Sequence, residues 1–318
     1  MARELIYTSA QRGLKPGTRG FCTVAHTRGM KPSLIRLLES LSAYKSQTTG
    51  NYDTDAEQQP PAISHHRTFI AGESFSILSR VGHSGRDFTN RQNKLAYHLV
   101  LDPAERPQAG PAWLAGQPHL LRDHWDKPPQ IIPEPRPIPD GKLTKTFASN
   151  WETLTGDAGW AGVVVRELNR NPSGIIYLIY EPGMDILPLI EDVTAILPPP
   201  KRWTLSFNTL FTHLPAGVNC TLRCCPPTAA SLKDVRTTAG AFKLDLSRGL
   251  GDAPENVYVK IARGEQVTLP QKTNRRQTPK ASAGQKTKKG GDDFVLLKNR
   301  TRKKLRMKHD DPRRKPGK

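Results

Sequence analysis

The sequence has no long apolar run. Its longest strongly apolar stretch, Ile175 to Tyr180, is far shorter than the roughly 18 residues of a membrane-spanning helix. The opening Met1-Ala2-Arg3-Glu4 lacks the apolar core of a secretory signal. We therefore expect no transmembrane segment and a cytoplasmic location.

Cysteine is also scarce, with 4 in 318 residues: Cys22, Cys220, Cys224 and Cys225. Three residues separate Cys220 from Cys224, but no second pair follows at the spacing of a zinc site. This pattern favours buried, reduced thiols over a metal site.

Common catalytic motifs are missing as well. The sequence has no Gly-x4-Gly-Lys-Ser/Thr phosphate loop, no Gly-x-Ser-x-Gly nucleophile turn and no His-Glu-x-x-His metal pair. The run Asn93-Lys94-Leu95-Ala96 approaches the guanine-reading pattern Asn-Lys-x-Asp, but Ala96 replaces the carboxylate that would bind the base. We therefore expect a protein that is not itself a GTPase, that uses no cofactor or metal, and that is not an enzyme of a known type.

Positive charge is abundant but unevenly distributed. The chain has 48 Lys+Arg and 29 Asp+Glu, a net charge of +19, of which residues 271–318 carry +14 and the other 270 residues only +5. With one aromatic residue, the tail is too polar to bury a core, and we expect it to be disordered. Its basic run suits an anionic membrane surface or nucleic acid, or serves only as a solvated tail. The cations of this run are Lys298, Arg300, Arg302, Lys303, Lys304 and Arg306.

Hydrophobic spacing predicts a β-rich first half. Alternating or short apolar runs indicate strands, and Leu34, Leu37, Leu38 and Leu41 recur with helical spacing after Pro32. A two-residue Gly72-Glu73 loop of type II′ would join the third and fourth strands. The predicted strands are 4–9, 20–26, 67–71, 74–81 and 95–101.

The second half alternates helices and strands. Helical patterns end at Gly156 and at Pro198, and the apolar run 175–180 is typical of a buried parallel strand. Gly159 and Gly162 lower helix propensity and predict close backbone packing. The fold class expected is a mixture of α+β and α/β: a β-rich N-terminal half, an α/β C-terminal half and a disordered basic tail.

Prolines concentrate between these halves, which suggests a rigid linker. We expect four parts: a β-rich subdomain, the proline-rich linker, an α/β subdomain and the cationic tail. Their ranges are 1–127, 128–142, 143–270 and 271–318.

One polar cluster is the candidate site. Asp87, Arg91, Asn93 and Lys94 precede a strand that carries His98 on the face opposite its leucines. Such groups bind an anion or a partner, or they only form turn hydrogen bonds; the latter is the simpler interpretation. Tyr7 and His26 complete the candidate set, and a pocket that gathered them with Arg91 and His98 would favour an unrecognised enzyme.

Four groups of residues resemble the N-terminal domain, type two, of the bacterial GTPase-associated protein family. The motifs occur in family order over residues 3–225. They are Ile6-Tyr7-Thr8-Ser9-Ala10 with Gly20-Phe21-Cys22-Thr23; Asp87-Phe88-Thr89 with Asn93-Lys94-Leu95-Ala96-Tyr97-His98; Gly156-Asp157-Ala158-Gly159-Trp160 with Tyr180-Glu181-Pro182-Gly183; and Arg202-Trp203-Thr204 with Arg223-Cys224.

The resemblance implies an adaptor that acts beside a small GTPase in a bacterial conflict or signalling system, and it brings no catalytic residues. The leading hypothesis is therefore a non-enzymatic cytoplasmic adaptor that binds a GTPase or its complex, tethered by its tail. The alternatives are a nucleic-acid-associated protein that binds through the tail and an enzyme of unrecognised type that uses residues 87–98.

Overall fold

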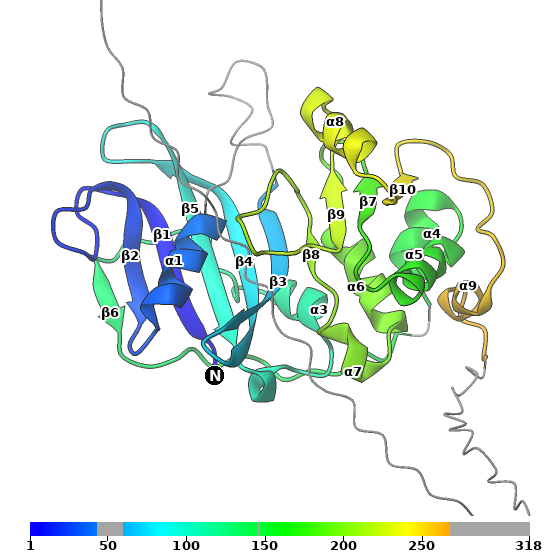
Figure 1. Cartoon of the computed structure of the whole chain (residues 1–318), viewed down its shortest axis with the longest axis horizontal. Coiled ribbons are helices and arrows are strands. Elements are labelled where there is room, and N and C mark those ends of the chain that lie inside the picture. The colour runs from blue at the N-terminus through cyan, green and yellow to red at the C-terminus, as the bar shows by residue number, and fades with distance from the viewer. Residues whose placement is uncertain (43–59, 146, 268–318) are drawn as a thin grey trace, which may run out of the picture. The chain divides into compact units, whose positions relative to one another are not determined.

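The computed structural model describes residues 1–42, 60–145 and 147–267 (Figure 1). The six candidate cations of the tail lie outside the described residues. Within them, helices and strands mix as expected, and no helix is long and apolar enough to cross a membrane.

The described strands form one ten-stranded sheet in the order β10-β7-β9-β8-β3-β4-β5-β1-β2-β6. The first part of the sheet consists of β3, β4, β5, β1 and β2, which pair antiparallel, and of β6, which is parallel to β2. The second part consists of β8, β9, β7 and β10, which pair parallel. In chain order the strands are β1 (Arg3–Ala10), β2 (Gly20–Thr27), β3 (Ala62–Ile70), β4 (Glu73–Arg86), β5 (Gln92–Leu101), β6 (Gln130–Ile132), β7 (Ile176–Ile179), β8 (Phe207–Asn208), β9 (Leu222–Cys225) and β10 (Phe242–Asp245).

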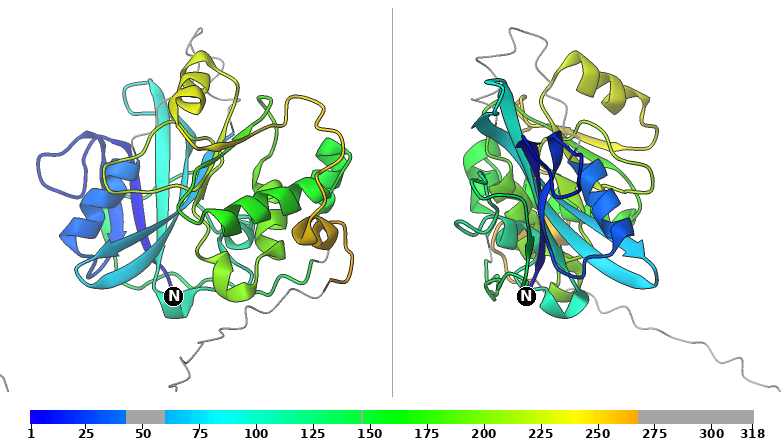
Figure 2. Two further views of the ribbon diagram at one scale, coloured as in Figure 1. Left: turned by 45° about the vertical axis from the view of Figure 1, so that its right-hand side comes forward. Right: turned by 90° about the vertical axis from the view of Figure 1, so that its left-hand side faces the viewer.

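Helices cover this sheet on both faces (Figure 2). They are α1 (Pro32–Leu41), the 3-10 turn η1 (Pro103–Glu105), α3 (Pro111–Ala115), α4 (Ser149–Thr155), α5 (Gly159–Arg170), α6 (Leu187–Ile196), α7 (Pro199–Arg202), α8 (Ala229–Thr237) and α9 (Val257–Ala262).

The antiparallel part has a core on each face. On one face, Leu34 and Leu38 of α1 pack against Leu5, Ile77 and Val100. On the other face, the alternating leucines of β5 pack against α3 and the segment that follows it. Strand alternation therefore separates Leu99 from His98, as the sequence predicts.

The β3–β4 hairpin departs from its predicted turn. Ile70 pairs with Glu73, so the loop consists of Ala71 and Gly72, and both have positive φ, 50° and 85°. Two positive φ values define a type I′ turn, so the prediction of a type II′ turn at Gly72-Glu73 was wrong. The loop begins one residue earlier than predicted, so Gly72 occupies its second position instead of its first.

The parallel part forms the α/β half. β7 lies between β9 and β10, and all four of its residues are buried, as its apolar run predicts. Leu178 faces α4, α5 and α6, whereas Tyr177 and Ile179 face α8. All four cysteines are buried and unpaired, as expected.

The two parts join through β3 and β8. Ser64 pairs with Asn208 and His65 pairs with Phe207, although about 140 residues separate them in sequence. The sheet is therefore continuous across the two halves.

The proline-rich segment lies against the first part of the sheet. Residues 130–132 form β6, parallel to β2, and Arg136 exchanges two backbone hydrogen bonds with Ala2. Arg136 also donates to Glu4 Oε1 over 3.3 Å, and Tyr97 donates to the same carboxylate. This network fixes the segment to β1 and β5.

Two glycines of α5 permit a close approach of α9, as their positions predict. A Cβ atom on Gly162 would lie 2.3 Å from the carbonyl oxygen of Tyr258, and one on Gly159 would lie 2.8 Å from Val259 Cγ1. α5 and α9 therefore pack backbone to backbone at this point.

Candidate interaction site

Asp87 organises the turn between β4 and β5. Its Oδ1 accepts hydrogen bonds from Thr89 Oγ1 at 2.6 Å, Thr89 N at 2.8 Å and Arg91 N at 3.1 Å. Its Oδ2 accepts one from Ser9 Oγ of β1 at 2.9 Å. The side-chain hydrogen bond from Thr89, followed by the backbone donors, holds the pKa of the Asp87 carboxyl well below its usual range. Asp87 is thus an ionised turn residue whose oxygens are already occupied.

Asn93 links the other end of this turn to β1. Its Oδ1 accepts from Thr8 Oγ1 and Ser9 N, both at 3.2 Å, and from Lys94 N at 2.8 Å. Lys94 is half-buried, and burial lowers the pKa of its ammonium group. Asp87 and Asn93 therefore come together as predicted, in hydrogen bonds that shape the hairpin.

The hairpin leaves a distinct set of side chains exposed. Phe88 is 45% exposed, and the Arg91 side chain is 73% exposed. Arg86 is also exposed, and its Nη1 donates to the Asn90 carbonyl, which braces the loop.

Phe21 of β2 belongs to the same end of the sheet. It is 50% exposed and pairs with Ser9, the residue whose hydroxyl group reaches Asp87. The β1–β2 loop and the β4–β5 hairpin are both at the upper left of Figure 1. We call the exposed group Phe21, Arg86, Phe88 and Arg91 the hairpin-end surface.

Tyr7 and His26 are placed elsewhere on the α1 face. Tyr7 Oη donates to the Phe21 carbonyl at 3.0 Å, and burial, then the charge of Glu39, raises the Tyr7 pKa. His26 Nδ1 lies 2.9 Å from the carbonyl oxygen of Thr27 in its own strand. Among the described residues, neither side chain forms a hydrogen bond with the Asp87 turn.

His98 is enclosed beneath the end of α1. Its Nδ1 lies 2.7 Å from Ser79 Oγ and its Nε2 lies 2.9 Å from Ser42 Oγ. Ser42 donates its single hydroxyl proton to the Leu38 carbonyl, so it accepts from His98 Nε2–H, and Ser79 donates to Nδ1. Burial lowers the His98 pKa to about 3, so the ring is neutral and ties α1 to the sheet.

The described pockets do not gather Tyr7, His26, Arg91 and His98 in one place, although a pocket of about 270 Å³ is lined by Asp87 and Asn93. Arg91 is exposed in the hairpin, whereas His98 is fully buried with both ring nitrogens occupied. The observed contacts of Asp87, Asn93 and His98 are structural.

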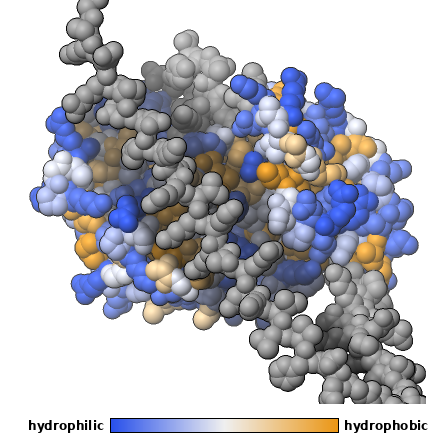
Figure 3. Space-filling view, viewed as in Figure 1, coloured by the Kyte–Doolittle hydropathy of each residue, from blue (hydrophilic) through white to orange (hydrophobic). Residues whose placement is uncertain are grey.

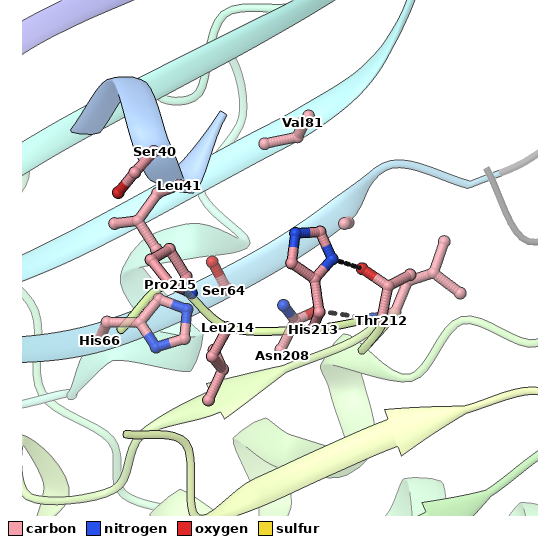
Figure 4. A pocket seen from close by; sticks show the side chains of 12 residues that line it. Ser40, Leu41, Ser64, His66, Val81, Asn208, Thr212, His213, Leu214 and Pro215 are labelled. Carbon is pink, nitrogen blue, oxygen red and sulfur yellow. Dashed lines mark hydrogen bonds between the residues drawn. The ribbon is translucent and has the colours of Figure 1, made fainter. Parts of the chain in front are cut away.

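A small pocket near α1 contains histidines that sequence reasoning missed. Figure 4 shows the rings of His66 and His213 among the side chains that line it, with Ser64 and Asn208. Burial lowers the His66 pKa to about 4. The pocket has a volume of about 30 Å³, which accommodates only one or two water molecules. The pocket is too small for an organic ligand.

Sequence reasoning also missed the two phenylalanines of the hairpin-end surface. Figure 3 shows hydrophilic side chains over much of one face, with smaller hydrophobic areas between them. The sequence signal for one of the two phenylalanines was Phe88 within a charged turn. The exposed large hydrophobic residues among those described are Met1, Phe21, Phe69, Phe88, Ile131 and Phe147.

Family comparisons confirm the family but divide the resemblance between two domains, because the motifs that begin at Gly156 and at Arg202 lie in the middle domain and not in the N-terminal domain. Residues 1–138 match GTPase-associated protein 1, N-terminal domain type 2, and residues 148–248 match the middle domain of GTPase-associated protein 1. The chain belongs to the GTPase-associated protein 1 family. No curated protein and no solved structure matched.

The two matched regions together contain both parts of the sheet. The N-terminal region contains the hairpin-end surface and α1, and the middle region contains β7 to β10. α9 follows the middle region yet packs on α5 within it. Membership in the family points to a GTPase as partner.

Proposed function

We propose that the chain is a non-enzymatic adaptor that binds a GTPase, or a complex containing one, through the hairpin-end surface. Two exposed phenylalanines beside two exposed arginines support this assignment most directly. Aromatic and arginine side chains are enriched at the centres of protein interfaces.

The rigidity of the hairpin also supports this role. Asp87 accepts four hydrogen bonds from its own turn and from Ser9, and Arg86 braces the opposite side. A surface that is already ordered loses little conformational entropy when a partner binds. Phe88 is thus presented at low entropic cost.

An unrecognised enzyme built on residues 87–98 is the weaker alternative. The Asp87 oxygens are occupied, and His98 has no lone pair or proton available to a substrate. A nucleophile paired with a base is what such an enzyme would need.

The tail supplies a second proposed activity, because residues 271–318 carry a charge of +14. We propose that it tethers the adaptor to an anionic surface, with nucleic acid as the alternative. Vesicles with anionic lipid and an unrelated duplex DNA distinguish the two. If the chain truncated at residue 270 still binds the vesicles or the DNA, the tail is not the binding segment.

The experiment for the main proposal is affinity capture from the native cells with GDP or a non-hydrolysable GTP analogue added. The proposal is supported only if the captured protein hydrolyses GTP and if its recovery depends on the nucleotide. Phe88→Ala must abolish capture, whereas Phe69→Ala, at the tip of the β3–β4 hairpin, must preserve it. Capture of no GTPase in either nucleotide state would refute the proposal.

A further inference from the structure

A larger cavity opens where the two matched regions meet. It has a volume of about 320 Å³, within the usual range for small-molecule sites, which favour domain junctions. Arg67 of β3 contributes from the N-terminal region, and every other lining residue comes from the middle region. We call it the junction pocket.

The charged side chains that line the junction pocket are all positive. Arg67 and Lys201 are the charged residues among those described that line the pocket, and both are exposed. Within the described part of the chain, neither cation forms a salt bridge with a carboxylate. Lys201 Nζ instead donates to Asn169 Oδ1 at 2.9 Å, and Asn169 Nδ2 donates to the Val165 carbonyl at the same distance. Asn169 thus holds the ammonium group at the pocket wall.

A third cation lies close to Arg67. The Arg106 guanidinium is near enough for Arg67 to lower its pKa, although burial lowers it more. Arg106 Nε and Nη2 are buried and have no hydrogen-bond partner in the described residues. The nearby Asp102 carboxylate is engaged by Arg3 at 2.7 Å.

A fully buried polar atom lies in the same neighbourhood. His65 is 0% exposed and lies within the electrostatic range of both Arg67 and Arg106. Its Nδ1 donates to the Leu205 carbonyl at 2.6 Å, and Leu205 lines the junction pocket. Its Nε2 has no partner in the described residues. Unpartnered buried polar groups are rare in folded proteins and mark places where a bound ion, water or ligand completes the structure.

The remaining walls add apolar and hydroxyl groups. Leu168, Pro172 and Leu197 form apolar surface, and Thr204 and Thr221 contribute hydroxyl groups. A ligand that fits both kinds of wall has an anionic head and an apolar or planar body. Arginine and lysine recognise phosphate as a fork and as a point charge, respectively.

We propose that the junction pocket binds the phosphoryl group of a small phosphate monoester, with Arg67 and Lys201 as its direct ligands and the apolar wall beneath its organic portion. A pocket of about 320 Å³ favours a small molecule over a polymer backbone. The proposal is independent of GTPase binding, since the hairpin-end surface lies at another end of the sheet.

Isothermal titration of the full chain tests this with three probes: inorganic phosphate, phenyl phosphate and phenol. We expect phenyl phosphate to bind at least tenfold more tightly than inorganic phosphate, and phenol not to bind at millimolar concentration. The double variant Arg67→Gln/Lys201→Gln should weaken phenyl phosphate binding at least tenfold.

The matched control is Arg12→Gln/Lys233→Gln, which removes the same charge from exposed residues outside the pocket and leaves the basic tail intact. It should change affinity less than twofold. Melting curves check that all variants fold. Equal weakening in both double variants would show binding by general charge and overturn the proposal, as would no binding of phenyl phosphate to the unaltered chain.

Discussion

Arg263 and Asp157, 106 residues apart, form a two-pronged ion pair: Nε lies 2.8 Å from Oδ1 and Nη2 lies 2.7 Å from Oδ2. The same carboxylate accepts from the backbone N–H groups of Gly159 and Ala253, both at 2.7 Å. The side-chain hydrogen bonds from Arg263 hold the Asp157 pKa well below its usual range. This pair fastens the segment around α9 to the start of α5.

Breaking this pair should destabilise the fold. In Arg263→Gln the nearly buried Asp157 carboxylate loses two charge-assisted bonds, so we expect the free energy of unfolding to fall by about 2 kcal/mol in urea titrations. Arg248→Gln removes an exposed pair with Asp245 and should cost less than about 0.5 kcal/mol. Equal effects of the two variants would contradict this role.

Gly162→Ala should separate α5 from α9. The added methyl would meet the Tyr258 backbone, which cannot move aside as a flexible side chain could. We expect a loss of about 1–3 kcal/mol in unfolding free energy. Gly249→Ala is the matched control, because a Cβ there meets nothing within 4 Å. An unfolding free energy of Gly162→Ala equal to that of the control would contradict the close packing of α5 and α9.

Three buried histidines should make the fold sensitive to mild acid. Burial lowers the pKa to about 3 for His65 and His98 and to about 4 for His66. The unfolded chain, with histidine pKa values near 6.5, takes up protons that the folded chain does not. Stability should therefore be constant above about pH 7.5 and fall as the pH drops from 6.5 towards 4.

The slope should approach 1.4 kcal/mol per pH unit for each histidine at the steepest point. Urea titrations at pH 7.5, 6 and 5 measure it. His98→Gln should lower stability at pH 7.5, since Ser42 and Ser79 lose their partner, yet flatten the slope by about a third. A stability that does not change between pH 7.5 and 5 would show that these rings are protonated in the folded state.

In the polar turn between β4 and β5, Asn93 should stabilise the fold, whereas Arg91 should contact the partner. Asn93→Ala removes the Oδ1 that accepts from the backbone N–H groups of Ser9 and Lys94, and it should lower the unfolding free energy by about 1–3 kcal/mol. Arg91→Ala removes a side chain that is 73% exposed and whose bond to Thr89 and ion pair with Asp87 lie at the surface, so it should change the unfolding free energy by less than about 0.5 kcal/mol. Chemical unfolding of both variants checks this, and a large loss in Arg91→Ala would assign Arg91 to the fold rather than to the partner.

Local patterns predicted the local structure well. The spacing of Leu34 and Leu38 produced α1, the apolar run before Tyr180 produced β7, and Gly156 ends α4 with a φ of 78°. Each depends on residues a few positions apart, so periodicity and propensity suffice.

Long-range relationships escaped sequence reasoning. The β3–β8 pairing joins Ser64 to Asn208, and no local pattern encodes a partner that far along the chain. His98 was a candidate for function because its own strand gave no sign of Ser42, which belongs to the end of α1. Asp87 and Asn93 were predicted to lie together, but the exposure of Phe88 depends on how the hairpin and β2 pack.

The central claim is that Phe88 and Phe21 contact the GTPase. Its most direct test is the dissociation constant of the captured GTPase for the unaltered chain, Phe88→Ala and Phe69→Ala, measured by isothermal titration in the favoured nucleotide state. We predict a loss of at least tenfold for Phe88→Ala and less than twofold for Phe69→Ala, with melting temperatures unchanged. Full affinity in Phe88→Ala, or equal losses in both variants, would contradict the account.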